Sequence, residues 1–538
     1  MKGVKDMANF ELVVRNAKIV DGSRNPWFKG DVGINKGKIV YMGKVQDDVE
    51  ANQIIDAQGR VLAPGFIDIH SHYDLSLFRD PVMLSALQQG VTTNVFCQCG
   101  LSPAPIRTDR IADIDKYTGF IKGGAEISWG WRSFGDFLDV LDTLGLGANV
   151  ASFVGHGTIR LNVMGFETRD PSKEEMIEMK RLAIASLEEG AYGLSSGLIY
   201  PPGIYSKPSE LQELATVLKQ FNALYISHIR NESNCVIEAV KETIELAEKV
   251  EVPAQVAHHK AGGKRNWGLV KNTLELLDEA RLRGVDMTID QYPYTMASTT
   301  LRNILPPWVH EGGVEKIIER LINPIIREKI IKEINIGNQW ENFWINSDGA
   351  KGVVVVDTPY TPEYEGETIE DISKLLKKDP LETVFELIIA NKGYDMACFF
   401  IMSEDDVKYV MKHPLSMVGS DSVPAAPGAK CHPRTSGTFP RVLGKYVREE
   451  KNLTLEEAIW KMSGFPATRL KMLNKGFIRV GMDADLVIFD PNIVIDKSDL
   501  KDPFKKPIGI DYVVIDGQIV IDEGIFTGKK VGKVCRRR

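Results

Sequence analysis

The central part of the chain alternates short apolar segments with helical segments, and this alternation limits the possible folds more than any other feature. Eight apolar segments have the length and composition of strands: 65–72, 91–99, 149–156, 191–199, 223–228, 252–258, 285–292 and 416–421. Helical segments lie between them, and two, at 172–190 and 233–250, each carry a serine near the start that is suited to cap the helix. Repeated β–α units predict a parallel sheet, either closed into a barrel or open and doubly wound.

Polar and metal-binding residue types follow nearly every one of these strands at its carboxyl end. Barrel enzymes place their chemistry at that end of the strands. We therefore predict an α/β fold with a TIM-like (β/α)8 barrel over residues 63–469. Residues 297–395 are too long for one crossover between the seventh and eighth strands, so we expect an inserted subdomain there, which could serve as a lid.

The two ends of the chain share a different character. Residues 8–62 and 470–538 contain short β-rich runs separated by glycine and Asp-Gly turns. Neither segment alone supplies enough strands for a stable domain. The expectation is that both termini join in one small β-sandwich.

Composition excludes several classes of protein. The net charge of −7 argues against general nucleic-acid binding, which needs a strongly basic surface. No apolar run approaches the ~20 residues that span a bilayer, and the first residues lack the apolar centre of a signal peptide. Six cysteines in 538 residues are too few for a disulfide framework. A cytoplasmic protein with neither nucleic acid nor membrane as partner is expected.

The first predicted strand ends in GFIDIHSHYD. Side chains alternate faces along a strand, so His70 and His72 point to one side with Asp68 in phase. Two imidazoles at that spacing can bind one metal ion. Two polar loop histidines are the alternative, but the preceding Pro-Gly and apolar strand favour ligands.

The second strand ends in two cysteines, Cys97 and Cys99, that share a face and could both look into the barrel. A thiolate is a strong zinc ligand. Free cysteines are also common as small buried hydrophobes, so a structural role is the alternative.

Histidines close two further strands. His228 ends the fifth, and the adjacent His258 and His259 end the sixth. Only one of the adjacent pair can face the barrel axis, and we choose His258, with His259 supporting the site from outside. Asp421 ends the last strand, where a carboxylate beside a metal suits a group that takes a proton from water and returns it to a leaving amine.

Together these motifs give the chain a resemblance to the amidohydrolase superfamily, and specifically to its N-acyl-D-amino-acid deacylase (D-aminoacylase) branch. The resemblance covers nearly the whole chain and lies in PGFIDIHSH, QCG, SHIRNE, AHHK, DQYPY, GSD, GLSSGLIYPPG and HPRTSGTFPRVLG. The lysine that bridges two metals in many superfamily members is absent from the fourth strand, AYGLSSGLIY.

The resemblance implies a particular metal centre. Cys99, His228 and His258 would hold one tight Zn2+, while His70 and His72 would form a weaker second position. Cys97 departs from the branch, which usually has a small residue there.

The implied reaction is hydrolysis of an N-acyl-D-amino acid by zinc-activated water, with Asp421 as general base and acid. Lys260, Tyr292 and Arg434 occupy matching motifs and would bind the substrate carboxylate. Two alternatives stay open: a D-dipeptidase or cyclic-amide hydrolase, such as a hydantoinase or dihydroorotase, on the same scaffold, and a non-catalytic relative.

Overall fold

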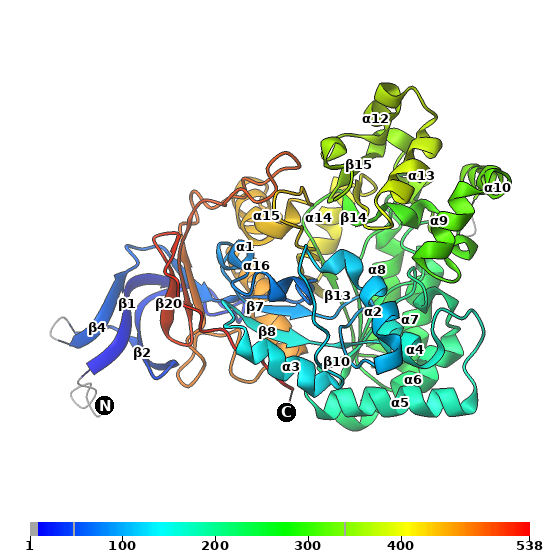
Figure 1. The fold of residues 1–538 in the computed structure, drawn as a ribbon. Helices are drawn as coiled ribbons and strands as arrows, with labels where there is room; N and C mark the ends of the chain where they lie inside the picture. Colours follow the sequence, from blue (N-terminus) through cyan, green and yellow to red (C-terminus); the bar gives the residue numbers. More distant parts are fainter. Residues whose placement is uncertain (1–8, 47–48, 338–339, 538) are drawn as a thin grey trace.

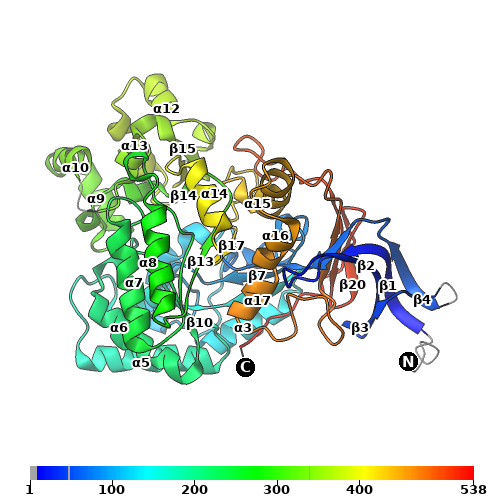
Figure 2. The ribbon, with the colours of Figure 1, turned by 180° about the vertical axis from the view of Figure 1, so that it is seen from behind.

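Eight strand positions form a closed parallel barrel, seen in the larger part of the molecule in Figures 1 and 2. The computed structural model describes residues 9–46, 49–337 and 340–537. Around the barrel the strands are β6 (Phe66–Asp68), β7 (Val91–Phe96), β8 (Asn149–Ser152) with β9 (Val154–Gly155), β10 (Gly193–Gly197), β11 (Leu224–His228), β12 (Ala254–Val256), β13 (Met287–Gln291) and β17 (Ser416–Val418). Every pairing between neighbouring barrel strands is parallel.

Two irregular contacts complete the ring. The third strand is interrupted at Phe153, whose N–H still donates to the Phe96 carbonyl at 3.1 Å. The first and last strands meet through a parallel bridge between Ser71 and Ser422. The (β/α)8 barrel predicted from the alternating pattern and from the polar residues at the strand ends is therefore confirmed.

Helices cover the outside of the barrel (Figures 1 and 2). In chain order they include α1 (Leu84–Leu87), α2 (Ile111–Tyr117), α3 (Phe134–Thr143), α4 (His156–Met164), α5 (Lys173–Glu188), α6 (Pro208–Phe221), α7 (Val236–Val250), α8 (Val270–Leu282), α14 (Glu404–Lys412), α15 (Arg434–Arg441), α16 (Leu455–Met462) and α17 (Gly464–Arg469). Helix α5 begins with the expected cap, because Ser172 and Glu175 form a reciprocal capping box. Helix α7 does not: Cys235 occupies the cap position without a side-chain bond, and the Ser233 hydroxyl donates to Asn231 instead.

Strands from both ends of the chain form one sheet of nine strands, which Figure 1 shows beside the barrel. Its members are β1 (Asn9–Ile19), β2 (Phe28–Asn35), β3 (Lys38–Gly43), β4 (Glu50–Asp56), β5 (Val61–Pro64), β18 (Leu486–Phe489), β19 (Ile510–Ile515), β20 (Gln518–Asp522) and β21 (Ile525–Phe526). The expected β region built from both termini is confirmed, but as a single sheet, because β5 pairs with β1 on one side and β18 on the other.

Alternation along β5 and β18 connects this sheet to the barrel. Leu62 and Leu486 belong to a hydrophobic cluster inside the β region. Val61, Ala63 and Val487 point to the other face and belong to the main core with the barrel. The two-residue period of a strand thus gives each strand one face for each core.

The segment between β13 and β17 carries its own small sheet. The antiparallel order is β14 (Ala297–Thr300), β16 (Met396–Phe399) and β15 (Val353–Val356). Its helices are α9 (Val314–Ile322), α10 (Pro324–Ile336), α11 (Phe343–Asn346), α12 (Ile369–Leu376) and α13 (Pro380–Ala390). Figure 1 shows these elements gathered above one side of the barrel.

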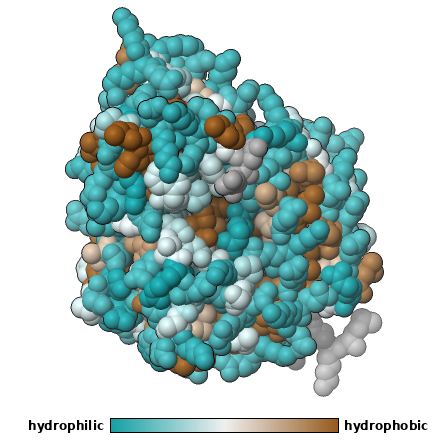
Figure 3. All heavy atoms as spheres, turned by 90° about the vertical axis from the view of Figure 1, so that its right-hand side faces the viewer, coloured by the Kyte–Doolittle hydropathy of each residue, from teal (hydrophilic) through white to brown (hydrophobic). Residues whose placement is uncertain are grey.

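On the face turned toward the viewer in Figure 3, hydrophilic side chains predominate and hydrophobic ones form separate small patches. Among the described helices, none combines the length and apolar composition required to cross a bilayer.

Candidate metal centre and substrate cavity

The carboxyl end of β6 is held against the end of β17 by Asp68. Its carboxylate accepts hydrogen bonds from the N–H of Ser420, at 2.8 Å, and from the Ser420 hydroxyl. The N–H of Asp421 in turn donates to the His70 carbonyl at 2.7 Å. These bonds place His70 and Asp421 side by side although 350 positions separate the neighbouring Ser420 from His70 in the chain.

Cys97 and Cys99 differ in surroundings. Strand β7 ends at Phe96, and both cysteines have positive φ angles of 61° and 55°, so the strand alternation no longer decides where they point. The Cys99 Sγ lies 3.4 Å from the Nε2 atoms of both His70 and His258. Cys97 belongs to the hydrophobic core, and its N–H donates to Asp74 at 3.0 Å.

His228 and His258 approach from the next two strands. His228 is the last residue of β11, and His258 follows β12 by two residues. Their ring centroids are 4.3 Å apart, with the rings nearly perpendicular. The His259 ring contacts Thr273 of α8, with Nε2 2.8 Å from the Thr273 hydroxyl, and so lies outside this cluster.

The side chains brought together are suited to a metal ion. Three groups have all their ligand atoms within 4.8 Å of one another: His70, His72 and Cys99; Cys99, His228 and His258; and His70, His258 and Asp421. Both ring nitrogens of buried His228 lack a hydrogen bond among the described residues, a costly state that a ligated ion would relieve. Sulfur and imidazole nitrogen are the donors that zinc prefers.

Charges around the cluster favour the same interpretation. Burial, together with the positive charge of Lys260, holds the pKa of His258 well below its usual range, and burial does the same to the pKa of His228. Neutral imidazoles are the form that binds metals. Burial and the nearby carboxylates raise the pKa of Cys99 well above its ordinary value, so a thiolate there requires a cation beside it.

Two buried carboxylates orient the histidines. Glu232 Oε1 lies 2.8 Å from His258 Nδ1, and Asp290 Oδ1 lies 3.2 Å from His70 Nδ1. Both contacts leave the Nε2 atoms facing Cys99. Neither acid is among the residues predicted from the sequence, although Glu232 ends SHIRNE and Asp290 begins DQYPY.

Asp421 lies between the cluster and a buried arginine. Its Oδ1 is 3.2 Å from His72 Nε2 and 3.6 Å from His70 Nε2, while Oδ2 is 2.7 Å from Arg434 Nη1. Burial alone would raise the pKa of Asp421, but the Arg434 guanidinium and the histidines outweigh it and hold the pKa well below the usual range. The carboxylate is therefore ionised beside the cluster.

The three residues predicted to bind substrate lie at the same site. Lys260 and Tyr292 line a small cavity of about 30 Å³ beside the cluster. Arg434 lies behind it, against Asp421. The Tyr292 hydroxyl has no hydrogen bond within the described part of the chain. The Arg434 guanidinium lies 4.6 Å from the centre of the Tyr292 ring. Lys260 donates to both oxygens of Glu232, at 2.6 and 2.7 Å.

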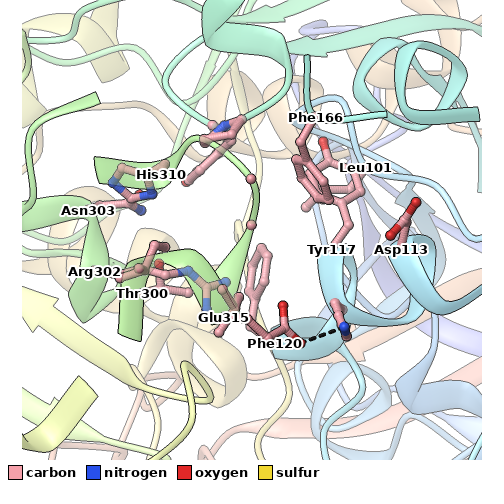
Figure 4. Close-up of a pocket in the computed structure, with 17 residues that line it drawn as sticks. Leu101, Asp113, Tyr117, Phe120, Phe166, Thr300, Arg302, Asn303, His310 and Glu315 are labelled. Atoms are coloured by element: carbon pink, nitrogen blue, oxygen red, sulfur yellow. Dashed lines mark ion pairs between the residues drawn. The ribbon is translucent and has the colours of Figure 1, made fainter. Parts of the chain in front are cut away.

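A second, larger chamber of about 90 Å³ adjoins this cavity and shares Leu101, Phe120 and Tyr200 with it. Figure 4 shows Tyr117 and Phe166 on the side opposite Asn303 and His310. Its two cationic side chains already have acidic partners. Lys116 is 2.5 Å from Glu315, the ion pair dashed in Figure 4, and Arg302 lies 3.8 Å from Asp395.

The chain is similar over nearly its whole length to known proteins. The chain is 32% identical over 533 residues to D-aminoacylase of Alcaligenes xylosoxydans xylosoxydans, covering 99% of each protein. It is 32% identical over 529 residues to N-acyl-D-glutamate deacylase of the same organism, covering 98% of this chain and 96% of the relative.

A solved structure has the same fold. The crystal structure of N-acyl-D-glutamate deacylase from Bordetella bronchiseptica, bound to zinc and a phosphonate inhibitor, superposes with a TM-score of 0.83 at 31% identity, covering 98% of this chain and all of that one. The profile described as "Amidohydrolase family" matches residues 53–521. The chain thus belongs to the amidohydrolase family and is akin to its N-acyl-D-amino-acid deacylases.

Proposed function

We propose that the protein is a zinc-dependent deacylase that hydrolyses the amide bond of N-acyl-D-amino acids to a free D-amino acid and a carboxylic acid. One observation carries the proposal: Cys99, His228 and His258 converge beside an ionised Asp421 in one buried cavity. Similarity to a D-aminoacylase over nearly the whole chain supports it.

Cys99, His228 and His258 would hold the tight zinc ion, and His70 with His72 would provide the weaker second position. When bound, zinc supplies Lewis-acid polarisation of the amide carbonyl and makes a water more acidic. Glu232 and Asp290 keep the histidines oriented for this task.

Asp421 is the proton carrier. Its Oδ2 is held by Arg434, whereas Oδ1 faces His70 and His72. Oδ1 therefore accepts a proton from the attacking water and then delivers it to the departing nitrogen. The ion pair with Arg434 keeps Asp421 ionised and fixes the carboxylate plane.

Substrate recognition follows from groups with spare hydrogen-bonding capacity. The Tyr292 hydroxyl and the Arg434 Nε lack partners among the described residues. Both can donate to the α-carboxylate of an acyl amino acid, and the charge of Lys260 adds attraction. Lys260 itself is committed to Glu232, so its contribution is mainly electrostatic.

The adjoining chamber indicates which substrates fit best. Its Phe120, Phe166 and Leu101 offer apolar surface, while Lys116 and Arg302 are matched by acids. A bulky apolar acyl group or side chain would bury area there, whereas a carboxylate would find no free cation. Apolar N-acyl-D-amino acids are therefore the preferred substrates.

A substrate panel tests the proposal. We expect turnover of N-acetyl-D-leucine, weaker turnover of N-acetyl-D-glutamate and none of N-acetyl-L-leucine. Turnover of a hydantoin, dihydroorotate or a D-dipeptide, without turnover of any acyl-D-amino acid, would instead assign one of the alternative amide hydrolases.

An Asp421→Asn variant separates an enzyme from a non-catalytic relative. Loss of a general base lowers kcat by about 10²–10⁴-fold. Zinc content measured after dialysis should match that of the wild type. Full activity of the variant would show that Asp421 is not the general base. If the wild type turned over no substrate of the panel, the proposed function would be wrong.

A further inference from the structure

A large cavity lies at the opposite end of the barrel from the metal centre. It has a volume of about 710 Å³, within the range of small-molecule sites. Leu224 is the first residue of β11, and Pro253, Asp286 and Leu415 directly precede β12, β13 and β17. The cavity therefore opens at the amino ends of the strands.

Four cationic side chains line the cavity: Arg281, Arg469, Lys471 and Arg537. Among the residues that the structure describes, only the first two have a carboxylate partner. Arg281 and Arg469 both pair with Asp286, at 3.3 and 2.8 Å. The other lining acid, Asp278, lies 3.2 Å from His413.

Lys471 and Arg537 remain without a carboxylate in hydrogen-bonding or ion-pair contact among the described residues. The Lys471 ammonium donates to the Asn222 carbonyl at 3.0 Å, a neutral partner. The pKa of Lys471 is lowered, first by burial and then by the charges of Arg537 and Arg469. These cations repel one another across the cavity, so an anion between them would be stabilised.

Arg469 adds a buried donor. Its side chain is 6% exposed, and its Nε has no hydrogen bond within the described ranges. An unmet donor of a buried arginine carries a desolvation cost that an anionic oxygen would remove.

Apart from Asn222, Thr288 and Thr468, the uncharged part of the wall is apolar or aromatic. Tyr192, Leu415 and Phe465 contribute to it, next to the cations. A ligand that fits both parts joins an anionic group to an apolar or aromatic one. Two unmatched cations and a free Nε correspond to the charge and the oxygens of one phosphate dianion.

We propose that this cavity is a binding site for an organic phosphate, such as a nucleoside monophosphate, with the phosphate at Lys471, Arg537 and Arg469 and the organic part against Phe465. The site is separate from the metal centre and does not depend on the proposed deacylase activity.

Binding of the phosphate would also restrain the C-terminal segment that contains Arg537. Val534 bridges to Val150, and the Arg537 N–H donates to the Gly190 carbonyl at 3.0 Å, so the C-terminal segment crosses the base of the barrel. A ligand held by Arg537 links this segment to Lys471, which follows α17. Stabilisation against unfolding is the expected consequence.

Calorimetry with adenosine 5′-monophosphate, inorganic phosphate and adenosine tests the site on the full chain. We expect one monophosphate bound per chain, more tightly than phosphate or adenosine alone. In the double variant Lys471→Gln/Arg537→Gln the affinity should fall at least about ten-fold, since each lost contact is charge-assisted.

The control double variant is Lys207→Gln/Lys264→Gln. It removes the same charge from exposed ion pairs with Asp170 and Asp348 and should bind like the wild type. No binding up to about 10 mM, or equal affinity in the two double variants, would overturn the site. Inorganic phosphate binding as tightly as the monophosphate would overturn the organic part of the proposal. Circular dichroism of each variant excludes misfolding as the cause.

Discussion

Residues of the candidate site could be predicted from the sequence where an apolar strand segment ends in polar residues. His70, His228 and Asp421 each lie at or just after a barrel strand, where the rule for parallel barrels places chemistry. Glu232 and Asp290 could not be chosen in this way, because Glu232 lies in the loop after β11 and Asp290 lies inside β13 and not after its end. Only the structure reveals that both are buried against histidine rings.

Glu232 gives the first residue-scale prediction. In Glu232→Gln the anionic partner of His258 Nδ1 and of the Lys260 ammonium is lost. Because such partners orient metal ligands, we expect zinc affinity to fall about 10–100-fold. Competition with a fluorescent chelator measures the zinc affinity of each protein. The control is His259→Gln, whose ring faces Thr273 and should leave the affinity unchanged. Equal affinities in both variants would contradict the orienting role.

The second prediction at the residue scale concerns Cys97 and Cys99. Cys99→Ala removes a thiol 3.4 Å from two histidines and should abolish tight zinc binding. Cys97→Ala removes a core side chain instead, so zinc binding should persist while the free energy of unfolding falls by about 1 kcal/mol. Metal analysis and urea unfolding of the pair distinguish the two roles. Retention of zinc by Cys99→Ala and its loss from Cys97→Ala would reverse the assignment.

At the scale of elements, the sequence predicted the eight strand positions and missed their local breaks. Strand β7 stops at Phe96, which explains why the spacing of Cys97 and Cys99 could not decide between them. The helix at 236–250 lacks the expected serine cap, since Ser233 bonds Asn231 within the preceding turn. Such outcomes depend on competing local hydrogen bonds, which periodicity does not report.

The 3-10 turn Pro307–His310 of the inserted segment gives a pH prediction. Burial lowers the pKa of His310 to about 4, against ~6.5 in an unfolded chain. Between these values the unfolded state binds the proton first, so stability present above pH 6.5 is lost as the pH falls toward 4. At pH 5 the loss is about 2 kcal/mol.

A His310→Gln variant should show a correspondingly smaller decrease in unfolding free energy between pH 7 and pH 5 than the wild type. Urea unfolding at the two pH values measures the difference. Parallel decreases in both proteins would show that His310 does not titrate in this window.

For the whole molecule, the proposed metal centre joins elements far apart in the chain, and we predict that bound zinc therefore contributes to stability. Cys99 and His258 lie just after β7 and β12, His228 is the last residue of β11, and the second group adds the end of β6. The alternating pattern and the polar strand ends together predicted that these strands share one barrel. The contact distances, however, depend on loops whose positive φ angles the sequence does not specify. A ligand that binds only the folded barrel stabilises it by about 4 kcal/mol at a concentration 1,000 times its Kd.

We therefore expect the chelator-treated protein to unfold at a lower temperature than the zinc-loaded protein. In a titration, the first equivalent of zinc should raise Tm more than the second. Cys99, His228 and His258 supply a thiolate and two neutral imidazoles, whereas the Nε2 atoms of His70 and His72 already face the Asp421 carboxylate. The variant Cys99→Ala should lose the first increment and Cys97→Ala should keep it. Equal increments for both equivalents would mean that the two positions bind zinc alike, and no increment would mean that the barrel does not need the ion to stay folded.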